Sequence, residues 1–335
     1  VYYKILFYTS LMTGTLIAIS AYSGMSMWIG LEINLLSIIP LMSSTNNMMA
    51  SEASLKYLVT QALASSLLLF SIIFMSMNNM FNMNFCPYLS LVFNTALFTK
   101  MGAAPFHFWF PEVIEGLSWI NTMIMLTWQK LAPMVLIMLS TNSFLYMIIV
   151  MIFSMAISGI MGLNQVSLRK ILVFSSINHI GWMIGSMMLM ETIWLFYFMI
   201  YSIITINIIL ILNKLNIFHL NQLYISMNYD HNFKMFFILN FLSLGGLPPF
   251  LGFMPKWLTI QLLSESNLFF IAFIMVLMTL MTLFFYMRIT FSTLLLSKTH
   301  ITYYKHAPMK NHLMMILNYT SIMGLITITF LFNLI

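Results

Sequence analysis

One apolar stretch combines a charge with a helix break: Leu97-Phe-Thr-Lys100-Met-Gly-Ala-Ala-Pro105-Phe-His-Phe-Trp-Phe-Pro111. A cation in such apolar surroundings costs several kcal/mol unless it is paired or hydrated. The glycine and proline that follow it are the residues that interrupt helices. A second lysine, Lys256, follows a similar Gly- and Pro-rich stretch, Leu244-Gly-Gly-Leu-Pro248-Pro249. The sequence therefore places two lysines beside two breaks in apolar helical segments.

Composition indicates an all-α integral membrane protein. Of 335 residues, 61% are hydrophobic and only 6% are charged, whereas soluble domains carry about 25% charged residues. The mean hydropathy is +0.96. A bilayer accepts the apolar exterior that such a chain must have. No secretory cleavage site follows the first apolar run, which we therefore expect to be a retained span.

The remaining composition excludes several classes of protein. The net charge is +6, but the basic residues form no cluster interleaved with aromatic residues, which argues against a nucleic-acid partner. Cys86 is the only cysteine, which excludes a disulfide framework and a CxxC metal site. Neither a Gly-x-Gly-x-x-Gly motif after a strand nor a Walker-type loop is present. The two histidines at membrane depth, His107 and His179, lie on different spans and could not sandwich haems. We expect no electron-carrying cofactor in this chain.

Apolar runs long enough to cross a hydrocarbon core of about 30 Å recur along the chain. We expect a single transmembrane domain over residues 1–335 with about eleven spans. These fall at roughly 4–21, 25–42, 53–77, 88–116 (broken), 118–140, 144–163, 168–189, 192–212, 234–263 (broken), 267–296 and 312–335. The connections between them are short and polar, and no linker divides the chain.

Eleven spans separate the charges of the connecting segments. One side then carries the N-terminus and the basic residues Lys4, Arg169, Lys170, Lys214, Lys298, Lys305 and Lys310, with Lys234 at its edge. The loops on the other side carry no Lys or Arg, only Glu191 and Glu265. The positive-inside rule identifies the basic side as cytoplasm or matrix.

Charged groups at mid-span are the candidate functional residues: Glu32, Lys100, Lys130 and Lys256, joined by His179. They could be structural ion pairs, for example Glu32 with one of the lysines. They could also form a proton path, because a lysine deprived of water gives up its proton more readily. Five such groups on five spans favour the path. Lys56 and Arg288 lie nearer span ends, where long side chains reach the interface, and we interpret them as structural.

The two broken spans run in opposite directions, and the order of lysine and break is reversed with the direction. This is expected of an inverted-topology repeat, in which discontinuous helices place polar backbone at mid-membrane depth. Unpaired backbone is tolerated there only beside protein or water, so each break predicts a hydrated pocket. Proline kinks without function are the alternative.

Several motifs resemble a known family. They are Trp28-Ile-Gly-Leu-Glu32-Ile-Asn-Leu-Leu, Glu52-Ala-Ser-Leu-Lys56-Tyr, Lys100-Met-Gly-Ala-Ala-Pro-Phe-His-Phe-Trp109, Thr127-Trp-Gln-Lys130-Leu-Ala-Pro133, Leu168-Arg-Lys-Ile-Leu-Val-Phe-Ser-Ser-Ile-Asn-His179 and Gly245-Gly-Leu-Pro-Pro-Phe-Leu-Gly-Phe-Met-Pro-Lys256-Trp. In this order they resemble the NADH–ubiquinone oxidoreductase chain 2 family, the mitochondrially encoded antiporter-like subunits of respiratory complex I, in its insect form. After about residue 265 only hydrophobicity matches.

The resemblance implies a role for each candidate residue in a proton relay. Glu32 matches the glutamate that faces the neighbouring subunit, and Lys100 the lysine of the first broken helix, expected to pair with Glu32. Lys130 matches the central lysine and Lys256 the lysine nearest the exit side. His179 is carried over as a connecting group. The chain begins where the fourth span of bacterial members lies, and its first residue is Val, so the true start is expected slightly upstream or at an unusual codon.

The resemblance also implies the surroundings of the chain. It would be a core subunit of the proton-translocating NADH:ubiquinone reductase, in the mitochondrial inner membrane, with its N-terminus in the matrix and its C-terminus in the intermembrane space. NAD, FMN, iron–sulfur clusters and ubiquinone would bind elsewhere in the complex. Its partners would be other membrane-arm subunits and lipids such as cardiolipin. A stand-alone or multi-subunit cation/proton antiporter and a structural membrane scaffold are the two alternatives.

Overall fold

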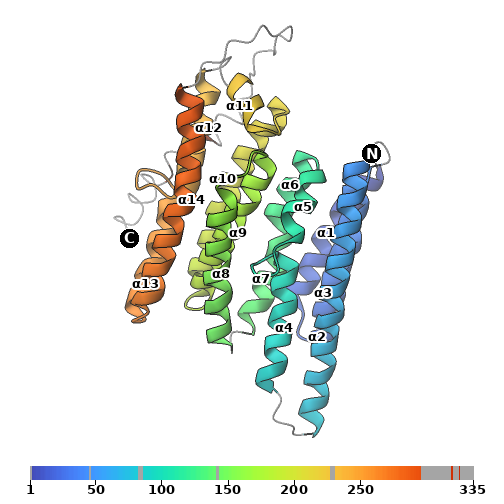
Figure 1. Cartoon of the computed structure of the whole chain (residues 1–335). Coiled ribbons are helices and arrows are strands. Elements are labelled where there is room, and N and C mark those ends of the chain that lie inside the picture. Colours follow the sequence, from blue (N-terminus) through green and yellow to red (C-terminus); the bar gives the residue numbers. More distant parts are fainter. Residues whose placement is uncertain are drawn as a thin grey trace. The chain divides into compact units, whose positions relative to one another are not determined.

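The computed structural model describes residues 2–44, 47–81, 86–140, 143–226 and 231–295, together with 318, 319 and 324. Residue contacts divide the chain into two compact units, residues 1–154 and 155–335. Figure 1 shows the helices of both units. The last expected span, 312–335, lies outside the described residues except for these three positions.

The first unit contains seven helices in its described part and the start of an eighth. They are α1 (Tyr2–Ser20), α2 (Gly24–Met42), α3 (Met48–Phe81), α4 (Cys86–Met101), α5 (Trp109–Gly116), α6 (Trp119–Leu126), α7 (Trp128–Met138) and α8 (Phe144–Gly162), which continues into the second unit. Helix α3 runs beside α4 and also packs on α2 and α5, while α7 contacts α1 and α4 (Figure 1). A Cβ atom on Gly30 of α2 would lie 2.5 Å from the backbone nitrogen of Ala18, so glycine is what lets α1 and α2 approach so closely.

The second unit is built around a buried helix. Its described helices are α9 (Leu168–Met187), α10 (Glu191–Leu215), α11 (Leu220–Ser226), α12 (His231–Gly245), α13 (Phe253–Glu265) and α14 (Phe269–Leu295). Every residue of α9 from Ile171 to Met187 is buried, and α10, α13 and α14 pack against it. A helix with polar residues that is buried all round brings those residues into the core of the unit.

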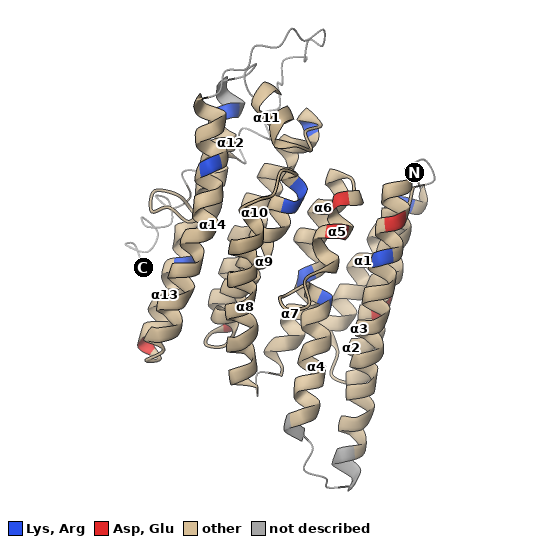
Figure 2. Cartoon of the chain, viewed as in Figure 1, with Lys and Arg blue, Asp and Glu red and all other residues tan. Residues whose placement is uncertain are grey.

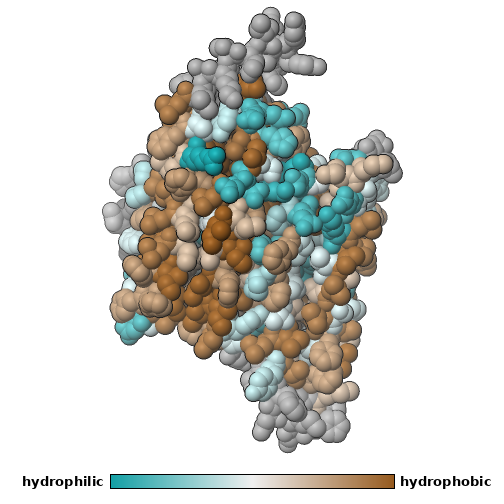
Figure 3. Space-filling view, viewed as in Figure 1, coloured by the Kyte–Doolittle hydropathy of each residue, from teal (hydrophilic) through white to brown (hydrophobic). Residues whose placement is uncertain are grey.

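The outer faces of the helices are apolar. Large hydrophobic side chains are exposed along α3 and α14, for example Leu63, Phe70, Phe273 and Phe284. Figure 2 shows that charged residues are sparse along the helices, and Figure 3 shows hydrophobic side chains over much of the visible face. Exposed apolar faces of this size suit lipid or a partner subunit rather than water.

Six helical stretches in the described part of the chain are long and apolar enough to cross a membrane. They are Gly24–Met42, Met48–Met77, Trp119–Met138, Phe144–Gly162, Glu191–Leu215 and Phe269–Leu295. Each corresponds to one of the eleven expected spans, so the fold is helical and membrane-type, but the count of eleven is not confirmed. The described residues contain no strand, only one isolated bridge between Ser167 and His219.

Two local features differ in detail from the expectations. The stretch Trp119–Met138 is apolar and long enough for the span expected over 118–140, but its helix is interrupted at Thr127, between the end of α6 at Leu126 and the start of α7 at Trp128. The Thr127 hydroxyl donates a hydrogen bond to the carbonyl of Met123, four residues earlier, at 2.7 Å. A threonine that bonds back in this way bends a helix. The loop expected over 213–233 contains the short helix α11, whose start is capped by Gln222 through the backbone N–H of Phe218.

Candidate functional site

The first break follows α4. Gly102 has φ +73°, a conformation that glycine adopts without strain. Its N–H bonds to the carbonyl of Thr99 at 3.2 Å, and the N–H of Ala103 bonds to the carbonyl of Phe98 at 3.1 Å. This pair of bonds is the Schellman motif that closes a helix. The chain resumes as α5 at Trp109, whose indole N–H donates to the Thr99 carbonyl at 3.1 Å.

The second break repeats this arrangement after α12. Gly246 has φ +77°. Its N–H bonds to the carbonyl of Ser243 at 3.0 Å, and the N–H of Leu247 bonds to the carbonyl of Leu242 at 3.4 Å. Both half-helices therefore end in the same cap, and each cap uses a glycine of a break that the sequence predicted.

Lys256 joins the two halves of the second broken helix. It lies in the first turns of α13, and its Nζ donates to the carbonyl oxygen of Gly245 at 2.8 Å, with that of Leu244 at 3.5 Å. These carbonyls belong to the end of α12, where the helix dipole favours a cation. A Cβ atom on Gly246 would lie 2.8 Å from Cδ of Lys256, so this lysine packs directly on the glycine. Its Nζ lies 5.9 Å from the centroid of the Trp182 ring.

Lys100 occupies the corresponding position at the first break, but it lies on the helix before the break and not on the helix after it. It belongs to the last turn of α4 itself and is 8% exposed. Here too a cation lies at the carbonyl end of a half-helix. Each break thus carries one buried lysine, on the helix before the break in the first case and on the helix after it in the second. His107, inside the first break, is also buried, with its Nδ1 3.3 Å from the Pro105 carbonyl oxygen.

Lys130 lies on α7 and is 1% exposed. Its Nζ lies 5.8 Å from the centroid of the Phe110 ring. Phe110 is the second residue of α5, so the central lysine contacts the helix that follows the first break. The face of an aromatic ring attracts a cation without taking its proton.

Glu32 and Lys100 do not form the close pair that the resemblance implied. Glu32 is partly exposed on α2, whereas Lys100 is buried. Within the described part of the chain the two groups do not reach ion-pair distance. Glu32 does not line the pocket beside Lys100, because its neighbours Leu31 and Asn34 occupy that face of α2.

The residues interpreted as structural have different partners. Lys56 forms ion pairs with Glu52 at 2.9 Å and with Glu112 at 3.0 Å. All three side chains are at least 42% exposed. Arg288 donates to the carbonyl of Leu163 at 3.2 Å. These cations lie at the surface, unlike the buried lysines.

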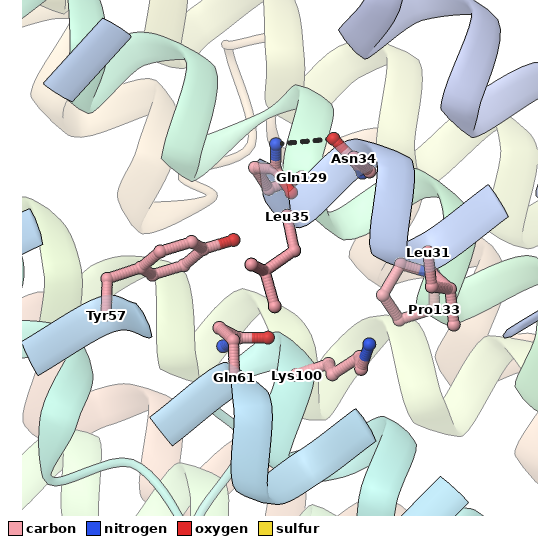
Figure 4. A pocket seen from close by; sticks show the side chains of 8 residues that line it. All are labelled: Leu31, Asn34, Leu35, Tyr57, Gln61, Lys100, Gln129 and Pro133. Atoms are coloured by element: carbon pink, nitrogen blue, oxygen red, sulfur yellow. Dashed lines mark hydrogen bonds between the residues drawn. The ribbon is translucent and has the colours of Figure 1, made fainter. Parts of the chain in front are cut away.

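Uncharged polar residues surround Lys100, and charge alone did not reveal them. A pocket of about 10 Å³ is lined by Leu31, Asn34, Leu35, Tyr57, Gln61, Lys100, Gln129 and Pro133 (Figure 4). The side-chain amide of Gln129 donates to that of Asn34 at 2.9 Å. The pocket brings together α2, α3, α4 and α7, and Gln129 is the neighbour of Lys130 in sequence.

His179 lies in a buried cluster of tyrosines in the second unit. Its Nδ1 is 2.9 Å from the hydroxyl of Tyr197 on α10, and its ring lies 5.1 Å from that of Tyr201. Tyr286 of α14 is buried in the same unit, at 1% exposed. Phenol hydroxyls both donate and accept hydrogen bonds. The hydroxyls of this cluster can therefore form hydrogen bonds between neighbouring helices, away from bulk water.

The structure thus groups Glu32, Lys100 and Lys130 in the first unit and His179 and Lys256 in the second. Trp182, which Lys256 contacts, follows His179 by one turn of α9. Among the described residues, no group of three or more His, Cys, Asp or Glu could hold a metal ion.

Comparison with known proteins gives concordant matches. Residues 21–282 match the family model described as NADH:quinone oxidoreductase/Mrp antiporter, TM. A protein of Aedes aegypti named NADH-ubiquinone oxidoreductase chain 2 is 50% identical over 333 residues, which cover 98% of this chain and 97% of that protein. The protein of the same name from Anopheles gambiae is 46% identical over 341 residues, with the same coverage.

A solved structure matches the fold. A chain of respiratory complex I from Thermus thermophilus superposes with a TM-score of 0.80 at 21% identity. The match covers 88% of this chain and 71% of that one. At this identity the likeness concerns the fold.

Proposed function

The chain belongs to the NADH-ubiquinone oxidoreductase chain 2 family, and from this membership we propose the path by which it moves protons. It is a proton-translocating membrane subunit of respiratory complex I, and thus part of the enzyme classified as EC 7.1.1.2. The chemistry that NADH and ubiquinone undergo is assigned to other subunits. The contribution of this chain to proton translocation must therefore come from its own buried titratable side chains.

Protons pass along Glu32, Lys100, Lys130, His179 and Lys256. A movement of charge at Glu32 weakens its hold on Lys100. The Lys100 ammonium then loses a proton and becomes a neutral amine, while Lys130 takes up a proton. His179 connects Lys130 with Lys256, which releases a proton on the exit side. Electron transfer in other subunits, where NAD, FMN, iron–sulfur clusters and ubiquinone bind, supplies the free energy.

One observation carries this proposal. In the described part of the chain, neither Lys100 nor Lys256 forms an ion pair with a carboxylate, although each is at most 8% exposed. Structural ion pairs would hold a buried charge permanently, because breaking one leaves an uncompensated charge. Partners such as carbonyl oxygens and aromatic faces instead let a lysine exchange its proton at a lower cost.

The finer architecture is part of the proposal. We infer about eleven spans in a single antiporter-like domain, with the two breaks as equivalent parts of an inverted repeat. The identical Schellman caps at Gly102 and Gly246 support this. The N-terminus would lie in the matrix and the C-terminus in the intermembrane space of the inner mitochondrial membrane. The exposed apolar faces would contact other antiporter-like and small membrane subunits, and lipids such as cardiolipin.

Two experiments test the proposal. Co-purification of this chain with redox subunits is expected, and recovery as an independent antiporter would contradict it. Lys100→Met in the assembled complex separates a relay from a scaffold. A relay predicts fewer protons translocated per electron with normal assembly. A scaffold predicts altered assembly and an unchanged ratio in whatever complex forms.

A further inference from the structure

Three buried polar side chains meet at the pocket beside Lys100. Tyr57 and Gln61 are each 3% exposed, and Lys100 is 8% exposed. None of the three side chains forms a hydrogen bond with any residue that the structure describes, and the amide nitrogen of Gln61 is fully buried. All three line the same cavity. In Figure 4 the amide oxygen of Gln61 is turned toward Lys100, and Tyr57 extends its hydroxyl into the same pocket.

Three buried polar side chains without a hydrogen bond in one pocket require a hydrogen-bonding partner. Burying a polar group without a hydrogen bond costs about 1–3 kcal/mol, and more for a charge. Native interiors therefore satisfy nearly all such groups with protein or with ordered water. Of the other lining residues, Leu31, Leu35 and Pro133 offer no side-chain partner. Asn34 and Gln129 are hydrogen-bonded to each other.

The size and chemistry of the pocket select its occupant. Its volume is about 10 Å³, close to the least space that holds one water molecule. An organic ligand is far too large. No carboxylate lines the pocket, so a metal cation would meet only the repulsion of the Lys100 ammonium. A water has the two to four polar partners that it needs, since Lys100 donates, the Gln61 carbonyl oxygen accepts and Tyr57 can do either.

We propose that one water molecule occupies this pocket and that Gln61 is the positioning residue that holds it against Lys100. The inference rests on the proposed function, in which Lys100 gives up and regains a proton. The water accepts a hydrogen bond from the ammonium and donates one to the Gln61 oxygen. In the transfer step, one N–H bond of the Lys100 ammonium breaks and one O–H bond forms on the water. Another O–H bond of the water breaks, and its proton forms an N–H bond on the neutral amine of Lys130, the next group of the proposed relay. Gln61 neither gains nor loses a proton.

The first test is direct observation of the water in the assembled wild-type complex. A map that resolves ordered water is expected to show one density within hydrogen-bond distance of both Lys100 Nζ and the Gln61 side-chain oxygen. A dry pocket with Lys100 bonded directly to Gln61 would overturn the proposal. This measurement does not depend on any variant folding.

The second test is Gln61→Met, which keeps an unbranched side chain but removes the hydrogen-bonding amide. We expect a loss in protons translocated per electron, at normal assembly. The matched control is Ser71→Ala on the same helix, because Ser71 is also buried but bonds to its own helix at Leu68 and does not line the pocket beside Lys100. An unchanged ratio in Gln61→Met would overturn the proposal.

Lys100→Met distinguishes a failure of the proposed relay from a failure of the proposed water site. If it leaves the ratio unchanged, the relay itself fails. If it lowers the ratio while Gln61→Met does not, the relay stands and only the water site fails.

Discussion

The ammonium nitrogen of Lys256 lies 2.8 Å from the carbonyl oxygen of Gly245, the last residue of the helix before the second break. The final carbonyls of a helix have no partner within it. A lysine from α13 therefore completes the end of α12 and ties the two half-helices together. The same side chain is the proposed exit group, so Lys256 both caps α12 and takes part in the proposed proton transfer.

Gly246→Ala tests the close packing of this lysine. The substitution forces a side chain into φ +77° and places a Cβ atom 2.8 Å from Cδ of Lys256. The left-handed conformation alone costs about 1–2 kcal/mol. We expect less assembled complex and fewer protons per electron, measured by gel quantification and proton uptake. Gly245→Ala is the control, because its Cβ atom would meet no atom closer than 3.6 Å and its φ is negative. Equal behaviour of the two variants would contradict the packing seen here.

Lys256→Gln separates the capping of α12 from proton transfer. A glutamine amide can still donate to the Gly245 carbonyl but cannot carry a proton. We expect near-normal assembly with a lower proton-to-electron ratio, whereas Lys256→Met is expected to reduce both. If Lys256→Gln translocates protons like the wild type, Lys256 serves only as a cap.

Tyr197→Phe removes the hydroxyl that lies 2.9 Å from His179. A hydrogen bond of this kind contributes about 0.5–1.5 kcal/mol, so proton transfer through His179 is expected to slow by about two- to tenfold. NADH-driven proton release in reconstituted vesicles measures this. Tyr146→Phe is the control, since that hydroxyl has no hydrogen-bond partner among the described residues. An identical rate in both variants would remove Tyr197 from the path.

Lys56→Met is expected to leave proton translocation unchanged. Lys56 is a cation of the same helix that supplies Tyr57 and Gln61, but its ion pairs are exposed to solvent. Exposed ion pairs contribute little to stability, and Lys56 lines no part of the pocket beside Lys100. The same assay as for Lys100→Met applies. A loss as large as that of Lys100→Met would mean that surface charge, not burial, governs the effect.

The sequence predicted those features that depend on local chemistry. Glycines 102 and 246 lie where the chain must adopt positive φ, and such positions can be recognised from Gly and Pro spacing. The buried positions of Lys100, Lys130 and Lys256 follow from the length of the apolar runs around them. The family could be recognised because its motifs are spread in order along the chain.

Other features depend on contacts between distant segments. The bend at Thr127 arises from a side-chain hydrogen bond that competes with the helix, which charge and hydropathy do not record. The partner of Lys256 is a backbone carbonyl, and only the folded break brings it within reach. Tyr57 and Gln61 are uncharged residues in an apolar run, and their importance appears only when α3 meets Lys100.

Lys130→Met in the assembled complex tests the relay most directly, because Lys130 is the central group and is 1% exposed. The measurement is the number of protons translocated per electron transferred from NADH to ubiquinone, with Lys56→Met as the control. The relay predicts a lower ratio in Lys130→Met at normal assembly and an unchanged ratio in the control. A wild-type ratio in Lys130→Met would contradict it.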